Sequence, residues 1–303
     1  MNFEFTEEQL MIQKAARDFA QNELLPGVIE RDEHQKFPVE QVKKLGKLGF
    51  LGMMIPAEYG GSGLDTVSYV LAMEEISKVD ASVSVIMSVN NSLVCWGIEL
   101  FGNEEQKKKY LMPLAKGEII GAFCLSEPEA GSDATSQQTT AMDKGDYYLL
   151  NGTKNWITNG STASVYLVMA QTDASKGHKG INCLIVEKGM TGFTVGPKEN
   201  KLGIRGSDTH SLMFTDVKVP KENRIGEEQH LQDPRVEGLP GKSDNRWGRG
   251  QNTQPEIDFN GCIRDGGRSP GTSDCQGRGG AVRRGAWRCG STGGFPPSVE
   301  GRG

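Results

Sequence analysis

The sequence predicts an α+β fold in which an all-helical N-terminal domain, residues 1–118, precedes a small antiparallel β domain, residues 119–228. Apolar residues recur at helical spacing before residue 118, whereas short apolar runs separated by Gly, Lys and Asp follow it. A third observation sets residues 229–303 apart, because their composition differs from that of the rest of the chain.

The helical domain is predicted from start and stop signals. Four signals mark helix starts: the Thr6–Gln9 capping box, Pro38, Asp65 and the Asn103–Gln106 pair. Pro26 ends the first helix. A further helix over residues 80–96 is apolar nearly all round, which predicts that it is buried. Asn90 and Asn91 lie inside it and favour a core helix over a membrane span.

The β domain is predicted from short apolar runs and turn residues. Asn151-Gly152 lies between two apolar runs and predicts a hairpin, because both residues tolerate a positive φ. Further strands are predicted over residues 165–172, 181–189, 193–197 and 210–220.

Residues 229–303 have a different use of basic residues. Residues 1–228 carry 19 Lys and 4 Arg, whereas residues 229–303 carry 1 Lys, 10 Arg and 17 of the 40 Gly. Their apolar residues are isolated and follow no period, so this Gly/Arg-rich tail is expected to be disordered. A shifted reading frame or a faulty gene model near residue 228 would produce such a change, and the coding DNA would decide it.

Charge and cysteine use narrow the function classes. A net charge of -5 with mixed signs gives no general attraction to nucleic acid. The N-terminus shows neither an export signal nor an organelle leader, so a cytoplasmic location is expected. The six Cys contain no C-x-x-C pair and are expected to be reduced thiols, and no metal site is predicted.

Four ordered motifs carry a resemblance to a known family. They are PAEYGGSG at 56–63, GAFCLSEPEAGSD at 121–133, NGTKNWITNG at 151–160, and KLGIRGSDT at 201–209 followed by VPKENRIGEE. Helices followed by a β domain, with GAFCLSEPEAGSD at the junction, resemble the acyl-CoA dehydrogenase family, and most closely its short-chain, butyryl-CoA type. The resemblance covers residues 1–228.

The resemblance implies a site for FAD and an acyl-CoA substrate. Family positions that line the flavin and the start of the acyl-CoA channel correspond here to Phe123, Cys124, Leu125, Ser126, Glu127, Pro128, Glu129, Ala130, Gly131 and Ser132. Trp156 would cover one face of the flavin ring, and the hydroxyl of Thr158, which follows Ile157, would bond near flavin N5. Ser132 would also touch the pantetheine arm, and His178 and Lys179 would approach the CoA portion.

Simpler roles are open for the same residues. Trp156 alone is typical of an aromatic that packs on a sheet, and Ser126 and Ser132 are typical of turns. Glu127 is expected to be a loop residue rather than an acid or base, and Cys124 a small buried hydrophobe.

The family chemistry implies α,β-dehydrogenation of short-chain acyl-CoA thioesters, of the butyryl-CoA to crotonyl-CoA type in fatty acid β-oxidation. Electrons pass to an electron-transfer flavoprotein. In the family, the Glu that removes the α-proton comes from a second helical domain, within a Tyr-Glu-Gly-Thr segment. Residues 229–303 contain no such segment, so no catalytic residue is predicted, and the family homotetramer lacks its helical core here.

Three function classes therefore stay open. The first is an acyl-CoA dehydrogenase, and the second is a non-catalytic truncated or frameshifted remnant with residual flavin or CoA binding. The third is nucleic-acid binding by the tail, which contains Gly-Arg-Gly three times. Interspersed acidic residues and few aromatics argue against the third class, so neither a nucleic-acid nor a membrane partner is predicted.

Overall fold

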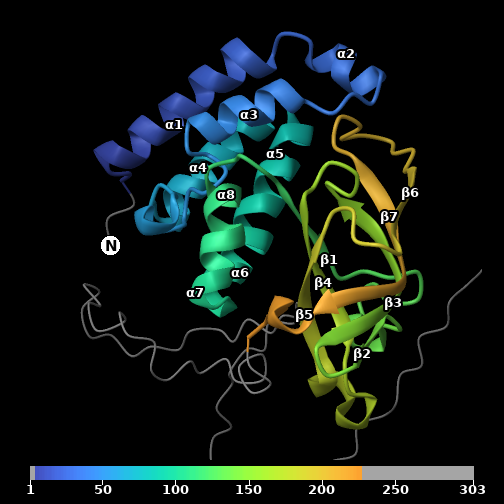
Figure 1. The fold of residues 1–303 in the computed structure, drawn as a ribbon. Coiled ribbons are helices and arrows are strands. Elements are labelled where there is room, and N and C mark those ends of the chain that lie inside the picture. Colours follow the sequence, from blue (N-terminus) through green and yellow to red (C-terminus); the bar gives the residue numbers. More distant parts are fainter. Residues whose placement is uncertain (1–3, 227–303) are drawn as a thin grey trace, which may run out of the picture. The chain divides into compact units, whose positions relative to one another are not determined.

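A computed structural model describes residues 4–226, and the expectations for residues 229–303 lie outside the described residues. The helical part, shown in blue to teal in Figure 1, runs to Ala115. Its helices are α1 (Glu7–Phe19), α2 (Val28–Glu33), α3 (Val39–Lys47), α4 (Thr66–Ser77), α5 (Ala81–Ser88), α6 (Trp96–Phe101), α7 (Glu104–Gln106) and α8 (Met112–Ala115). Wider π-helical turns extend or join them: Ala20–Leu24 after α1, Val89–Cys95 between α5 and α6, and Lys107–Leu111 between α7 and α8.

The predicted helix caps are confirmed. The Thr6 hydroxyl accepts from the Gln9 backbone N–H at 3.2 Å, and the Gln9 side chain accepts from the Thr6 N–H at 3.0 Å. Asp65 caps α4, and Asn103 with Gln106 forms a second capping box at α7. The sequence did not indicate α2, because its six residues are too few for an apolar period and it begins after a left-handed glycine, Gly27.

The long apolar helix is a core helix, as predicted, and runs from Ala81 to Phe101 through its π-helical turns. By length and composition alone it could cross a membrane, but 61% of its most apolar window is buried within the structure. Asn90 donates to the carbonyls of Leu51 at 2.8 Å and Leu114 at 3.2 Å, and accepts from the Gly121 N–H at 3.0 Å. The polar side chains that argued against a membrane span therefore bond the segments around the helix.

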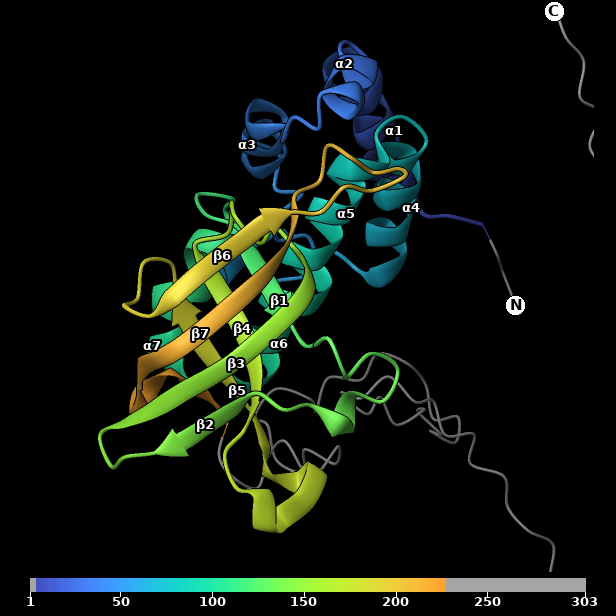
Figure 2. The same cartoon turned by 90° about the vertical axis from the view of Figure 1, so that its right-hand side faces the viewer.

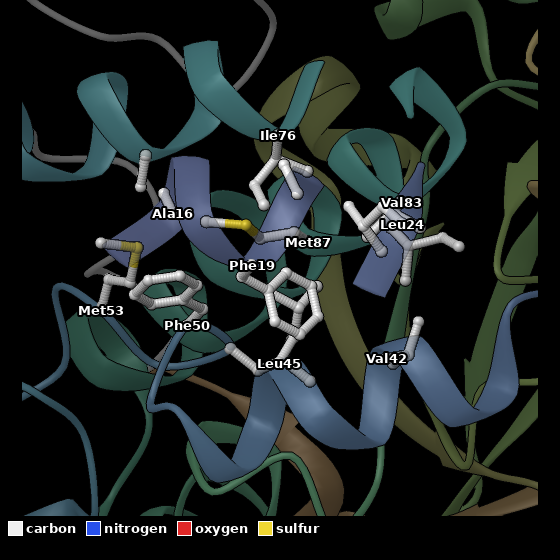
Figure 3. Close-up of a cluster of buried hydrophobic side chains, with 14 of the residues drawn as sticks. Ala16, Phe19, Leu24, Val42, Leu45, Phe50, Met53, Ile76, Val83 and Met87 are labelled. Atoms are coloured by element: carbon white, nitrogen blue, oxygen red, sulfur yellow. The ribbon is translucent and has the colours of Figure 1, made fainter. Parts of the chain in front are cut away.

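The core of the helical part gathers side chains from α1, α3, α4 and α5 and from the segment after α3. Figure 3 shows Phe19, Leu45, Phe50 and Met87 of this cluster. Leu45 and Met87 are fully buried, and Phe19 and Phe50 are nearly so. Apolar burial of this kind is the main force that holds short helices together.

The β domain forms one eight-stranded sheet among the described residues. Its strands are β1 (Gly121–Cys124), β2 (Thr140–Asp143), β3 (Tyr147–Thr158), β4 (Val165–Gln171), β5 (Ile181–Glu187), β6 (Phe193–Lys198), β7 (Thr209–Pro220) and β8 (Arg224–Ile225). The order is β6-β7-β3-β2-β4-β5-β8, with β1 paired to β4, and Figure 2 shows β6, β7, β3 and β2 side by side. The predicted antiparallel pairing is confirmed for most neighbours, while β1 and β2 pair with β4 in parallel.

The predicted hairpin at Asn151-Gly152 is wrong, because β3 runs through both residues without a turn. Gly152 has a φ of 147° and lies at a register shift between β3 and β7. A Cβ there would lie 2.4 Å from the Thr139 hydroxyl oxygen, so close approach explains the glycine. The Asn151 side chain bonds Asp216 on β7 through both its carbonyl and its amide, and the pair marks a bulge.

Helices and sheet share one apolar cluster. Val94 and Ile98 of the long helix pack with Leu167 of β4 and Ile185 of β5. Gln106 adds polar links, since its side-chain amide donates to the Glu222 and Arg224 carbonyls at 2.7 and 2.9 Å. The long helix therefore covers one face of the sheet at β4 and β5. β1, which pairs with β4, carries the first candidate site residues.

Candidate functional site

Three segments meet at one end of the sheet. Because β1 and β4 are parallel, the chain leaves β1 after Cys124 at the end where β4 finishes at Gln171. Thr140, which opens β2, pairs with Gln171 at this end. The second half of β3 reaches it too, since the Asn155 N–H donates to the Ser126 carbonyl at 2.8 Å. The loop after β1 and the part of β3 around Asn155, which precedes Trp156, are therefore neighbours.

The end of β3 holds its backbone in an uncommon conformation. Trp156 has a φ of 62° and lies at a register shift between Lys154 and Ile157. Its side chain is 62% exposed, so packing does not explain an indole at this position. Left-handed backbone at a bulky residue costs about 1–3 kcal/mol and gathers at functional sites. The strained backbone at Trp156 thus carries an indole that is exposed to solvent.

Two residues near Trp156 in the chain or in its hydrogen bonding carry hydroxyls: Ser126, whose carbonyl accepts from Asn155, and Thr158, two residues after Trp156. Within residues 4–226, the structure gives neither the Ser126 nor the Thr158 hydroxyl a hydrogen bond, although both side chains are half-buried. Hydroxyls that are free of partners within residues 4–226, on segments that adjoin an exposed indole, suit a flat ring system with a polar edge. The isoalloxazine implied by the resemblance has that character, so the residues present fit it.

The loop that follows Ser126 is closed by its own hydrogen bonds. Glu127 and Ala130 exchange two backbone bonds, of 2.9 and 3.2 Å, which make a tight turn. Asp133 accepts from the Thr135 and Ser136 hydroxyls, and these bonds lower the pKa of its carboxyl. Pro128, Glu129, Gly131 and Ser132 are left exposed on the outer side of the loop.

A buried ion pair between Lys154 of β3 and Glu127 holds this loop against β3. The Lys154 side chain is fully buried, and its ammonium contacts Glu127 Oε1 at 2.7 Å, the Leu125 carbonyl at 3.0 Å and Gln137 Oε1 at 3.1 Å. Glu127 also accepts from the backbone N–H groups of Gln138 and Thr139. The sequence did not indicate Lys154, because a lysine on a strand is typical of a solvent-facing position.

For both Glu127 and Lys154, burial and the contacts within the pair shift the pKa in opposite directions. Burial raises the pKa of Glu127, but hydrogen bonds from Lys154 and Thr139 outweigh it and the pKa ends lowered. Burial lowers the pKa of Lys154, and Glu127 offsets part of that shift. The carboxylate of Glu127 is thus held ionised and fully bonded, which agrees with its expected role as a loop residue rather than an acid or base.

Several candidate residues point into the protein. The side chains of Cys124 and Ile157 belong to the core of the sheet, and Ala130 is 1% exposed. Cys124 is fully buried in this core, as expected of a small buried hydrophobe, and its burial raises the pKa of the thiol. Phe123 and Leu125 alternate to the other face and pack toward the helices. These residues can offer a ligand at most their backbone or a ring edge.

His178 and Lys179 lie in a short helical segment, Ala174–Gly180, between β4 and β5. Both are exposed. The segment starts just after Gln171, whose N–H donates to the Thr139 carbonyl at 2.8 Å. It therefore emerges at the same end of the sheet as the loop that carries Ser132, and the CoA contact stays a prediction.

Two further buried residues shape the site and were not predicted. Asn159 follows Thr158 with a φ of 62°, and its side chain donates to the Gly121 carbonyl at 3.0 Å, which ties the end of β3 to the start of β1. Thr139 lies fully buried under Gly152. No group of His, Cys, Asp and Glu suited to a metal ion occurs among residues 4–226.

The helical part and the β domain each match a model of a known protein domain. Residues 6–118 match the model of the acyl-CoA dehydrogenase N-terminal domain, and residues 122–217 match that of the acyl-CoA dehydrogenase middle domain. A short-chain specific acyl-CoA dehydrogenase of Clostridium acetobutylicum is 50% identical over 228 residues, which are 75% of this chain and 60% of that protein. The chain thus spans about 60% of the length of this relative.

Three solved structures share the fold. A chain in a structure of the electron-transferring flavoprotein of Acidaminococcus fermentans is 50% identical with a TM-score of 0.74, over 76% of this chain and 60% of that one. Butyryl-CoA dehydrogenase from Megasphaera elsdenii is 47% identical with a TM-score of 0.72, over 75% and 60%. An acyl-CoA dehydrogenase complexed with FAD from Bacillus anthracis is 43% identical with a TM-score of 0.69, over 74% and 38%.

The order of helices and sheet, the ordered motifs and these matches agree with one another. The exposed Trp156 and the hydroxyl-bearing residues Ser126 and Thr158 lie within the matched middle domain. This chain therefore belongs to the acyl-CoA dehydrogenase family, of which it carries the N-terminal and middle domains.

Proposed function

We propose that this chain binds FAD and a short-chain acyl-CoA thioester for α,β-dehydrogenation, and that an electron-transfer flavoprotein receives the electrons. The observation that carries the proposal is the exposed Trp156, held in a left-handed conformation next to Asn155, which bonds Ser126, and two residues before Thr158. Within residues 4–226 the Ser126 and Thr158 hydroxyls have no hydrogen-bond partner. Relatives described as short-chain specific, as butyryl-CoA dehydrogenase, as complexed with FAD and as electron-transferring flavoprotein support each part of it.

The residues divide the work by chemistry. FAD, when bound, supplies the acceptor for the hydride that leaves the β-carbon of the acyl group. The Ser126 and Thr158 hydroxyls and nearby backbone groups would bond its polar edge, and the exposed Trp156 would cover one ring face and exclude water from it. The exposed Ser132 would meet the pantetheine arm, and the exposed His178 and Lys179 would face the CoA portion.

No base for the α-proton is assigned within residues 4–226. A base needs a carboxylate in a dry site that raises its pKa toward neutrality. Glu127 is buried but its pKa is lowered by its partners, and Glu129 is exposed. The second candidate function follows from this observation: a protein that holds flavin and thioester without turnover. A cytoplasmic location, the loss of the family homotetramer, and the lack of nucleic-acid and membrane partners stay predictions.

An anaerobic visible spectrum separates these functions. The purified chain is titrated with FAD, and butyryl-CoA is then added. A bound-flavin spectrum that bleaches supports the dehydrogenase, and a bound flavin that stays oxidised supports binding without turnover. Failure to bind any flavin contradicts both.

A matched pair of variants tests the site residues. Trp156→Ala should weaken FAD binding, whereas Met142→Ala, which removes a side chain that is 57% exposed on β2, should leave it unchanged. Equal binding by the two variants would remove Trp156 from the site.

A further inference from the structure

The loop between β1 and β2, residues 125–139, is called the cofactor loop below. The buried ammonium of Lys154 bonds this loop near both of its ends. Lys154 bonds the Leu125 carbonyl and Glu127 at the start of the loop, and Gln137 at its end. Glu127 in turn accepts from the N–H groups of Gln138 and Thr139, which close the loop onto β2. The ammonium of Lys154 therefore joins the start and the end of the loop to β3, and the lysine side chain is 0% exposed.

The next residue along the strand extends this anchor. The Asn155 N–H donates to the carbonyl of Ser126, directly between the two loop residues that Lys154 bonds. Ser126 is thus fixed from both sides relative to Trp156, which follows Asn155. Displacement of Lys154 would let the Ser126 hydroxyl move relative to the indole.

We propose that Lys154 is a positioning residue for the flavin, which holds Ser126 and Trp156 at the separation that the ring requires. The inference rests on the proposed function, and it names a residue that makes no contact with the ligand itself. Lys154 acts through the loop, and Glu127 is its obligatory counter-charge.

Stability alone does not explain such a pair. A buried ion pair pays a large desolvation cost, and well-packed apolar residues of similar volume often replace it without loss of stability. A buried pair with fully satisfied hydrogen bonds instead fixes one geometry. Here the bonded atoms belong to the segments that carry Ser126 and Trp156, so the geometry fixed is that of the cofactor site.

The test compares three variants with the unmutated chain. Lys154→Met removes the ammonium, and the double variant Glu127→Gln, Lys154→Met removes both charges, so that no uncompensated carboxylate stays buried. Arg31→Met is the matched control: Arg31 also forms a buried ion pair, with Asp80 at 3.0 Å, but does so at the start of α5 in the helical part. The readouts are the FAD dissociation constant, the positions of the bound flavin bands, thermal midpoints, and amide hydrogen exchange over residues 125–139.

The expected results separate positioning from general stability. Both Lys154 variants should bind FAD roughly tenfold more weakly or worse, with shifted flavin bands and faster exchange over the loop. The double variant should recover most of the thermal midpoint lost by Lys154→Met. Arg31→Met should lower the midpoint and leave FAD affinity and loop exchange unchanged.

Other results would overturn the inference. A double variant that binds FAD with unchanged affinity and bands shows that Lys154 only compensates Glu127. If Lys154→Met does not fold, the double variant decides by the same comparison. If the unmutated chain binds no FAD, the proposed function fails, and the positioning role fails with it; normal binding by the unmutated chain and by both Lys154 variants removes the positioning role alone.

Discussion

Asn90 offers a direct test of what holds the helical part to the sheet. Its side chain is fully buried and bonds three backbone groups: the Leu51 carbonyl, the Leu114 carbonyl and the Gly121 N–H. Gly121 opens β1, so this one amide joins the long helix to the strand that leads into the site. Asn90→Ala removes all three bonds and adds no new polar group.

The expected loss follows from those three groups. A hydrogen bond within a protein contributes about 1 kcal/mol net, so the loss of three bonds should cost the variant about 3 kcal/mol. For a fold of this size, 1 kcal/mol shifts the thermal midpoint by about 2–4 °C, which predicts a fall of about 6–12 °C. Circular dichroism at 222 nm during heating measures it.

Ser92→Ala is the control for Asn90→Ala. It lies on the same helix and removes one bond, to the Ser88 carbonyl at 2.8 Å within the helix itself. Its midpoint should fall by less than about 3 °C. If Asn90→Ala melts no lower than Ser92→Ala, the three bonds add no net stability and the reasoning is refuted.

Three further variants test charge, packing and strain. A hydrogen bond from Arg17 lowers the pKa of Glu75 to about 2, so its stabilisation is present above pH of about 4.5 and lost as pH falls toward 2. Acid titration of Glu75→Gln should show a shallower loss of stability over that range than the unmutated chain. Gly152→Ala should lower the thermal midpoint more than Gly145→Ala, because both have positive φ but only the first meets a close neighbour. Trp156→Asn should raise stability by about 1 kcal/mol in urea while it weakens FAD binding, and a loss of stability would contradict the strain at this position.

Local signals predicted much of the helical part. A capping box needs only residues three apart, so the Thr6–Gln9 and Asn103–Gln106 boxes could be recognised and are formed. The burial of the long helix could be predicted too, because its apolar residues surround it on all sides. Its two asparagines were recognised as core residues, but their partners outside the helix are 24 to 41 residues away and could not be recognised.

The sheet shows where local reasoning fails. Asn151-Gly152 has the residues of a hairpin turn, yet its conformation is decided by Thr139, the residue before β2, and by Asp216, 65 residues away. The chain turns instead before β3, where the Lys144 N–H donates to the Tyr147 carbonyl and Gly145 has a φ of 89°. Tertiary contacts thus override turn propensity at this position.

The candidate site divides in the same way. Ser126, Trp156 and Thr158 were identified by resemblance, and the structure brings their segments together. Lys154 was not identified, because its burial depends on a carboxylate 27 residues earlier in the chain. No property of the isolated strand distinguishes such a lysine from one that faces water.

One irregularity in β3 makes the arrangement possible. In a regular strand alternate residues share a face, so Lys154 and Trp156 would point the same way. The register shift between Lys154 and Ile157 breaks this alternation: Lys154 and Ile157 are both buried, and Trp156 between them is exposed. The bulge therefore lets residues 154–156 bond the cofactor loop through the buried Lys154 and expose the indole of Trp156 to solvent. Its strain at Trp156 is the energetic cost of placing both functions within three residues.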